Sequence, residues 1–149
     1  MEPSAPPWLD DWIGGAALPP PEAWDRPGLL LLFSVECAGC VSRAVPWLRR
    51  TAERHGEDLV LAAVHTAHGR RAQPREQVVE ALERFLAFAK LPTPVALDTT
   101  GAWAEAHGAE GTPHWFAYDR DGRRIRSIFG SQANAMTRLD YLLDELLGR

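Results

Sequence analysis

The chain contains two cysteines, Cys37 and Cys40, which are separated by Ala38 and Gly39 and follow the apolar run at residues 29–33. A cysteine pair with this spacing, at the junction of a strand and a helix, is typical of redox proteins. A helix that begins at Cys37 would bring the two sulfur atoms within disulfide range. Its unpaired N–H groups and its dipole would stabilise a thiolate on Cys37. A thiolate attacks a disulfide and a second thiol resolves the mixed disulfide, so the motif predicts thiol–disulfide exchange.

Length, composition and charge limit the class of protein. The 149 residues fit one domain with its own core, and a hydrophobic fraction of 46% is typical of a globular chain. The formal net charge of −4 argues against nucleic acid or an anionic membrane as the main partner. The longest apolar run is far shorter than the roughly 18–20 residues of a membrane-spanning helix, so we expect no membrane partner.

The first residues contain neither the basic segment nor the apolar segment of a secretory leader. We therefore expect a cytoplasmic protein, or a periplasmic or other extracytoplasmic one if a leader has been removed. In the cytoplasm a disulfide between the two cysteines would be transient and catalytic rather than structural.

Two regions differ in composition. Residues 1–27 are rich in proline and tryptophan and lack a regular hydrophobic period. We expect them to form an extended N-terminal arm with a short helical turn near residues 10–13, followed by one domain at residues 28–149. The tryptophans of the arm are expected to pack on that domain: Trp8, Trp12 and Trp24. The alternative is an arm that binds a partner protein.

Hydrophobic patterning predicts strands and helices that alternate along the domain. Runs of β character predict strands at residues 29–35, 59–65, 95–97, 114–118 and 123–129. Stripes at three- and four-residue spacing predict helices over residues 37 to about 55, from 74 past 86, over 100–107 and over 136–147. This order predicts an α/β fold of three layers, with helices on both sides of a mixed central sheet. Pro46 lies inside the first helix and should kink it.

With these elements in place, the chain resembles the thioredoxin-like superfamily, and within it the TlpA-like and DipZ-like thiol–disulfide oxidoreductases. The resemblance covers residues 28–147. It is carried by the strand that leads into Cys37 and Cys40, and by Gly111-Thr112-Pro113 ahead of a hairpin with an Asp-Gly turn. It implies a thioredoxin fold and a cis-proline at Pro113 that faces the cysteines. The Thr112 backbone would then pair with an extended substrate strand.

Several positions depart from the pattern of these families. Glu36 stands before the first cysteine, where an aromatic residue is common, and the dipeptide Ala38-Gly39 lacks the usual proline. Leu31 occupies the strand position of the buried acid in thioredoxins. Ser42 or Arg43 stands where many TlpA-like proteins have Glu. The resemblance therefore extends to the fold and the redox class, and not to the proton-transfer groups of these relatives.

Each candidate site residue has an expected role and an alternative. Cys37 is expected to be the exposed nucleophile of low pKa, and Cys40 the shielded resolving thiol. The alternative is a zinc site, but this needs about four ligands and only His65 and His68 could join the cysteines. Glu36 is expected to raise the pKa of Cys37 through its charge, or else to be a solvated loop carboxylate. His114 follows Pro113 and could affect the cysteines, although a structural role is the simpler expectation.

These expectations predict an enzyme that exchanges a dithiol for a disulfide with protein substrates. We expect it to act as a reductant, as a monomer supplied by an upstream dithiol, without metal or other cofactor. One alternative is a thiol-dependent peroxidase, although the Thr-x-x-Cys motif of peroxiredoxins is absent. The other is a non-catalytic binding module built on the same fold.

Overall fold

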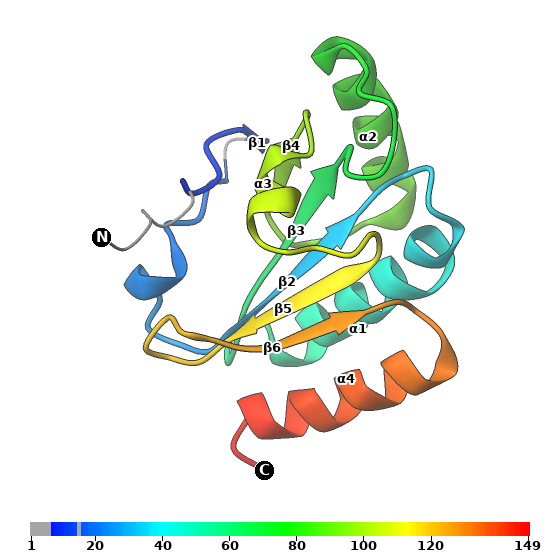
Figure 1. Ribbon diagram of the computed structural model, residues 1–149. Coiled ribbons are helices and arrows are strands. Elements are labelled where there is room, and N and C mark those ends of the chain that lie inside the picture. Colours follow the sequence, from blue (N-terminus) through cyan, green and yellow to red (C-terminus); the bar gives the residue numbers. More distant parts are fainter. Residues whose placement is uncertain (1–6, 15) are drawn as a thin grey trace.

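The computed structural model describes residues 7–14 and 16–149, and its centre is a six-stranded mixed β-sheet (Figure 1). The strand order is β1-β4-β3-β2-β5-β6. The strands are β1 (Trp12–Ile13), β2 (Gly28–Phe33), β3 (Val60–Thr66), β4 (Val95–Asp98), β5 (His114–Tyr118) and β6 (Arg124–Phe129). The α-helices are α1 (Val45–His55), α2 (Arg75–Ala89), α3 (Ala102–Ala106) and α4 (Ala133–Leu146), and a short 3-10 helix spans Pro21–Ala23. The predicted α/β class with a mixed sheet is confirmed.

The middle of the sheet is formed by the apolar run that precedes the cysteines. Strand β2 runs parallel to β3 and antiparallel to β5, and each of its residues is buried. Burial on both faces explains why β2 has continuous Leu residues instead of an apolar–polar alternation.

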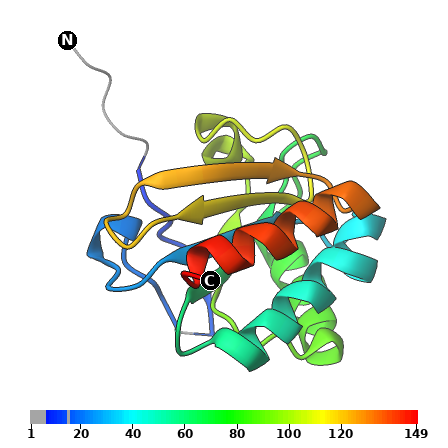
Figure 2. The ribbon, with the colours of Figure 1, turned by 90° about the horizontal axis from the view of Figure 1, so that it is seen from below.

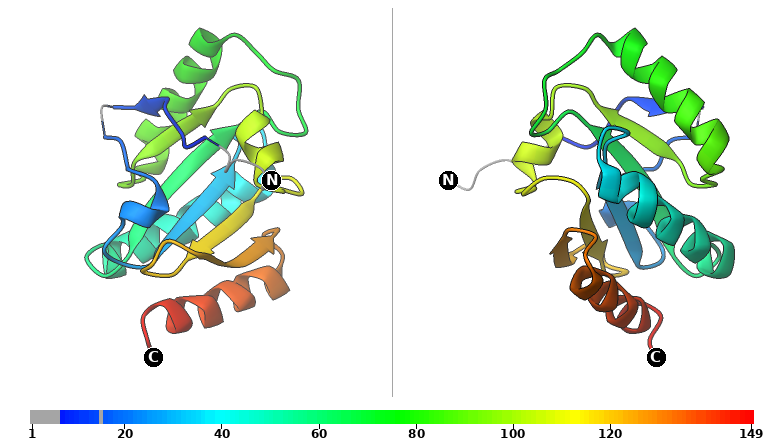
Figure 3. Two further views of the ribbon diagram at one scale, coloured as in Figure 1. Left: turned by 60° about the vertical axis from the view of Figure 1, so that its left-hand side comes forward. Right: turned by 90° about the vertical axis from the view of Figure 1, so that its right-hand side faces the viewer.

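Helices α1, α2 and α4 cover one face of the sheet, and α3 lies on the opposite side (Figure 2; Figure 3, right-hand view). The face under α1, α2 and α4 contains Leu29, Leu31 and Phe33, whereas the opposite face contains Leu30 and Leu32. None of the helices in the described part of the chain is both long and apolar enough to span a membrane.

The N-terminal arm completes the cover of the second face, as far as it is described; residues 1–6 and 15 lie outside the described part. Trp8, Trp12 and Trp24 pack there with α3. The expected helical turn near residues 10–13 is wrong, because Trp12–Ile13 is the edge strand β1, paired antiparallel with β4. Backbone pairing with β4 outweighs the weak local preference of this segment for a helical turn.

The first helix is irregular at the point where it contains Pro46. Residues Cys40–Ala44 form a π-helical turn, in which the Val45 N–H donates to the carbonyl oxygen of Cys40. Proline has no N–H to donate and its ring crowds the preceding turn, so a wider turn ahead of Pro46 relieves both conflicts. The irregularity expected at Pro46 is therefore a π-turn that links the cysteine motif to α1.

Removal of the Trp24 ring should destabilise the fold strongly. Trp24 is 6% exposed, donates its Nε1–H to the Pro19 carbonyl at 2.8 Å and packs edge-on against Tyr118. We expect Trp24→Ala to lower the free energy of unfolding by about 3–5 kcal/mol in urea denaturation. The matched control is Phe88→Ala, because Phe88 is 83% exposed and its removal should change stability by less than about 0.5 kcal/mol. Equal effects of the two substitutions would show that Trp24 is not part of the core.

Candidate active site

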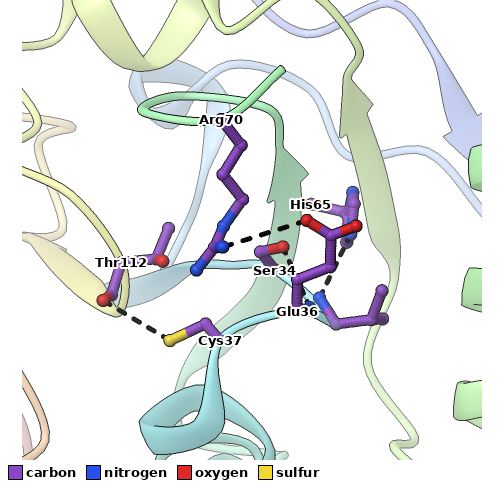
Figure 4. A network of polar contacts seen from close by, with 7 residues as sticks. Ser34, Glu36, Cys37, His65, Arg70 and Thr112 are labelled. Atoms are coloured by element: carbon purple, nitrogen blue, oxygen red, sulfur yellow. Dashed lines mark hydrogen bonds and ion pairs between the residues drawn. The ribbon is translucent and has the colours of Figure 1, made fainter. Parts of the chain in front are cut away.

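Three segments meet at one end of the sheet, around the two cysteines. Strands β2 and β3 are parallel, so the loops that follow them leave at the same edge; the antiparallel β5 begins there. The segments are residues 34–40 after β2, residues 67–74 after β3 and residues 110–113 before β5. Figure 4 shows residues from all three segments near Cys37.

Cys37 lies at the N-terminus of the helix that continues into α1. Its carbonyl oxygen accepts the N–H of Val41 at 3.1 Å, and its Sγ accepts the N–H of Cys40 at 3.3 Å. The Cys37 thiol donates in turn to the carbonyl oxygen of Thr112 at 3.5 Å. The sulfur of Cys37 therefore lies between the N–H groups of a helix N-terminus and the segment before β5.

The two cysteines differ in accessibility. Cys37 is 8% exposed and Cys40 is 0% exposed. The expectation that Cys37 is exposed is therefore wrong: its side chain is buried, because Thr112 lies against its sulfur. Cys37 is still the more accessible thiol, with Cys40 shielded behind it.

The two thiols also differ in pKa. Burial raises the pKa of Cys37, but the hydrogen bonds with Cys40 and with the side chain of Thr112, together with the charge of Arg70, bring the pKa below its ordinary value. Burial and the hydrogen bond to Cys37 raise the pKa of Cys40 to about 12. Cys37 is thus the thiol that ionises first.

Both cysteines are free thiols. Their side chains lie 2.6 Å apart and are not joined by a disulfide. Within the described residues, no cluster of three or more His, Cys, Asp or Glu side chains could hold a metal ion. His65 accepts the Val35 N–H on Nε2 at 3.3 Å, and burial lowers the pKa of His65 to about 4, so its ring is neutral and bonded to the backbone.

Pro113 and Gly39 pack closely beside the cysteines. The Thr112–Pro113 peptide bond is cis, and Pro113 is buried. A side-chain carbon at Gly39 would lie 3.9 Å from Cδ of Pro113 and would collide with the Ser131 hydroxyl. The close approach of Ser131 explains why glycine is suited to this position. Ser131 lies just after β6, and the sequence contains no pattern that connects it with the cysteines.

Glu36 turns toward a residue that the sequence analysis did not consider. Its carboxylate forms an ion pair of 3.8 Å with the guanidinium of Arg70, and the two side chains are 54% and 33% exposed (Figure 4). Arg70 is the charged side chain that helps to lower the pKa of Cys37. The sequence could have indicated Arg70, because its polar loop follows β3. This loop and the cysteine motif, which follows the parallel strand β2, must leave the sheet at the same end.

His114 serves the segment before β5. Its buried ring accepts the Glu110 N–H on Nδ1 at 3.1 Å and donates from Nε2 to Ser127 at 2.6 Å. Burial lowers the pKa of His114, which favours the neutral ring that this pattern requires. Both ring nitrogens are thus used to hold the segment that carries Thr112, and neither reaches a cysteine.

Iodoacetamide should modify Cys37 before Cys40 in the reduced, folded protein, because only Cys37 is both accessible and low in pKa. The rate should rise with pH through a midpoint below that of an ordinary thiol, while Cys40 stays unmodified until the pH approaches its own pKa of about 12. Peptide mapping by mass spectrometry measures both rates. Protein unfolded in urea is the control, in which both cysteines should react alike. Faster modification of Cys40 in the folded protein would contradict the assignment.

The ion pair beside the site predicts opposite shifts for its two partners. Arg70→Gln should raise the pKa of Cys37, because a positive charge near the thiolate is lost. Glu36→Gln should lower it, because the carboxylate no longer offsets the Arg70 charge. Ultraviolet absorbance of the thiolate against pH measures both shifts. The control is Arg71→Gln, which removes the same charge from the same loop. It should change the pKa of Cys37 less than Arg70→Gln does, because Arg70 is the charge that acts on this thiol. Shifts of the same sign for Arg70→Gln and Glu36→Gln would refute this coupling.

Comparison with known proteins gives a match in structure and not in sequence. No protein-family model and no curated protein matches the sequence. The structure is similar to a thiol-disulfide isomerase from Corynebacterium glutamicum, with a TM-score of 0.79 and 22% identity over 97% of each chain. It is also similar to StoA from Bacillus subtilis, with a TM-score of 0.69 and 19% identity over 93% of this chain and 99% of that one.

A third similar structure is a secreted disulfide oxidoreductase from Mycobacterium tuberculosis. The TM-score is 0.59 at 19% identity, over 74% of this chain and 73% of the other. At such low identities the likeness concerns the fold. The chain therefore has the thioredoxin-like fold of these thiol–disulfide proteins, as its two motifs predicted.

Proposed function

We propose that this protein is an enzyme that exchanges a dithiol for a disulfide with protein substrates, through Cys37 and Cys40. The observation that carries the proposal is the asymmetry of the two thiols. The pKa of Cys37 is lowered at a helix N-terminus, whereas Cys40 is fully buried with a pKa raised to about 12. Thiol–disulfide exchange needs an attacking thiol that ionises readily and a resolving thiol that stays protonated until the mixed disulfide has formed.

The reaction begins with the thiolate of Cys37. Its sulfur attacks one sulfur of a substrate disulfide, so that a mixed disulfide forms and the other substrate sulfur leaves as a thiolate. Cys40 then loses its proton to that thiolate and attacks the sulfur of Cys37. The mixed disulfide breaks, the second substrate thiol is released, and Cys37 and Cys40 end as a disulfide. Two electrons have passed to the substrate.

The environment of Cys40 assists the second step. Part of its raised pKa comes from the hydrogen bond and the charge of Cys37. Both are lost when Cys37 becomes part of the mixed disulfide, so the Cys40 pKa falls once resolution is needed. The attack therefore proceeds without a dedicated carboxylate, in keeping with Leu31 at the strand position of the thioredoxin acid.

The surface around Cys37 suits an extended polypeptide. Ala38 is exposed on one side of the sulfur, and the backbone of Thr112 and Pro113 lies on the other. A substrate strand that pairs with the Thr112 backbone would present its disulfide to the thiolate. One chain holds all the reacting groups, so a monomer is sufficient.

We assign the reducing direction for a protein in the cytoplasm, where an upstream dithiol would restore the two thiols. The secreted Mycobacterium tuberculosis protein of the same fold supports the extracytoplasmic alternative. The reduction potential of the Cys37–Cys40 pair is the quantity that separates a reductant from an oxidant.

Reduction of insulin with dithiothreitol as electron source tests the exchange reaction. The wild-type protein should accelerate it, and Cys37→Ser should reduce the rate to that of dithiothreitol alone, because no other accessible thiol exists. Cys40→Ser should instead accumulate a mixed disulfide with the substrate, visible by mass spectrometry and reversed by excess thiol. Wild-type protein without activity would favour the binding module. Consumption of peroxide without insulin reduction would favour the peroxidase.

A further inference from the structure

A groove with a volume of about 460 Å³ runs between helices α1 and α4, which lie side by side in Figure 2; we call it the α1–α4 groove. Its apolar lining residues are Pro46, Trp47, Met136 and Leu143. Asp140 is the acid among its lining residues, and its carboxylate accepts the Nε1–H of Trp47 at 3.3 Å. The groove therefore offers an apolar surface, and the carboxylate of Asp140 within it already accepts a hydrogen bond from Trp47.

The α1 side of the groove is positively charged. Its basic lining residues are Arg43, Arg50, Arg54 and His55. The three arginines are exposed, and none of them forms an ion pair with a carboxylate within the described residues. Arg49, on the same helix and outside the groove, is paired with Glu53 at 3.0 Å. The chain as a whole has a net charge of −4, whereas this side of the groove is positively charged.

One end of the α1–α4 groove reaches the cysteine motif. Arg43 donates to the carbonyl oxygen of Ser131 at 3.1 Å, and the hydroxyl of Ser131 faces Gly39. Arg43 lies in the π-turn that precedes α1, and Arg54 lies in the last turn of α1. At about 1.5 Å per residue of helix, the distance between them along the helix is roughly 16 Å. About five residues of extended peptide, at about 3.3 Å each, have this length.

We propose that the α1–α4 groove binds an extended acidic segment of the protein whose disulfide reacts with Cys37. Carboxylates of that segment pair with Arg50 and Arg54, and its apolar atoms pack on Trp47 and Met136. The segment begins a few residues from the reacting cysteine, because the groove begins beside Gly39. The identity of the partner as a disulfide substrate rests on the proposed function, whereas the preference for acidic peptide follows from the groove itself.

Binding is tested without the redox reaction, in the Cys37→Ser/Cys40→Ser protein. The probes are a fluorescent peptide with five consecutive Asp and Glu residues and a matched peptide of Asn and Gln. Fluorescence anisotropy should show that the acidic peptide binds more tightly, and that added salt weakens it. Arg50→Gln/Arg54→Gln in this background should raise its dissociation constant about tenfold. The control Arg120→Gln/Arg138→Gln makes the same change in net charge outside the groove, and should raise it less than about twofold.

Equal binding of the two peptides, or an equal loss in the two arginine pairs, would overturn the proposal. Wild-type kinetics with disulfide-bonded forms of the same peptides then separate it from the proposed function. Exchange that favours the acidic peptide, and loses this preference in Arg50→Gln/Arg54→Gln, supports both. Binding of the acidic peptide without exchange supports the groove and refutes the enzyme. Exchange at equal rates, without preferential binding, supports the enzyme and refutes the groove.

Discussion

The antiparallel pairing of β2 with β5 is the constraint on which the site depends. It places Leu32 opposite His114, so the residues that follow β2 and those that precede β5 emerge at one edge. Cys37 and Thr112 lie 75 residues apart in the chain and come into contact there. Both faces of β2 are buried, and a shift of register by one residue would exchange the side chains of its two faces between the two cores. The packing on both faces therefore also fixes this contact. The leucines of β2 thereby determine the position of the Cys37 sulfur.

Local patterns were sufficient for most of the fold and for the helix N-terminus that carries Cys37. The short apolar runs that became β2, β3 and β5 are buried in the sheet, as runs of this length between turn signals predict. The spacing of Cys37 and Cys40 implied a helix N-terminus. Patterns of this kind report on neighbours along the chain. They could not reveal Ser131, whose hydroxyl meets Gly39 only because β6 returns to the site, nor the edge pairing of Trp12–Ile13 with β4.

Charge near the reactive sulfur illustrates a further limit of sequence analysis. Glu36 is adjacent to Cys37 in the chain, which suggested direct repulsion of a thiolate. In the fold its carboxylate turns to Arg70, and Arg70 is the charge that acts on the thiol. Adjacent residues of an extended segment point in different directions, so adjacency in sequence does not establish a short distance between charged groups. The net influence of Glu36 therefore passes through its partner.

For the proposed exchange reaction, the limited access to Cys37 places a demand on the substrate. A thiol that is 8% exposed, with Thr112 against its sulfur, favours a substrate disulfide in an extended segment over one held inside a folded domain. Contacts made farther along the same polypeptide convert the approach of the disulfide into an intramolecular step and raise its effective concentration. A surface beside the site that recognises the flanking residues would therefore increase the rate without altering the chemistry of the thiols.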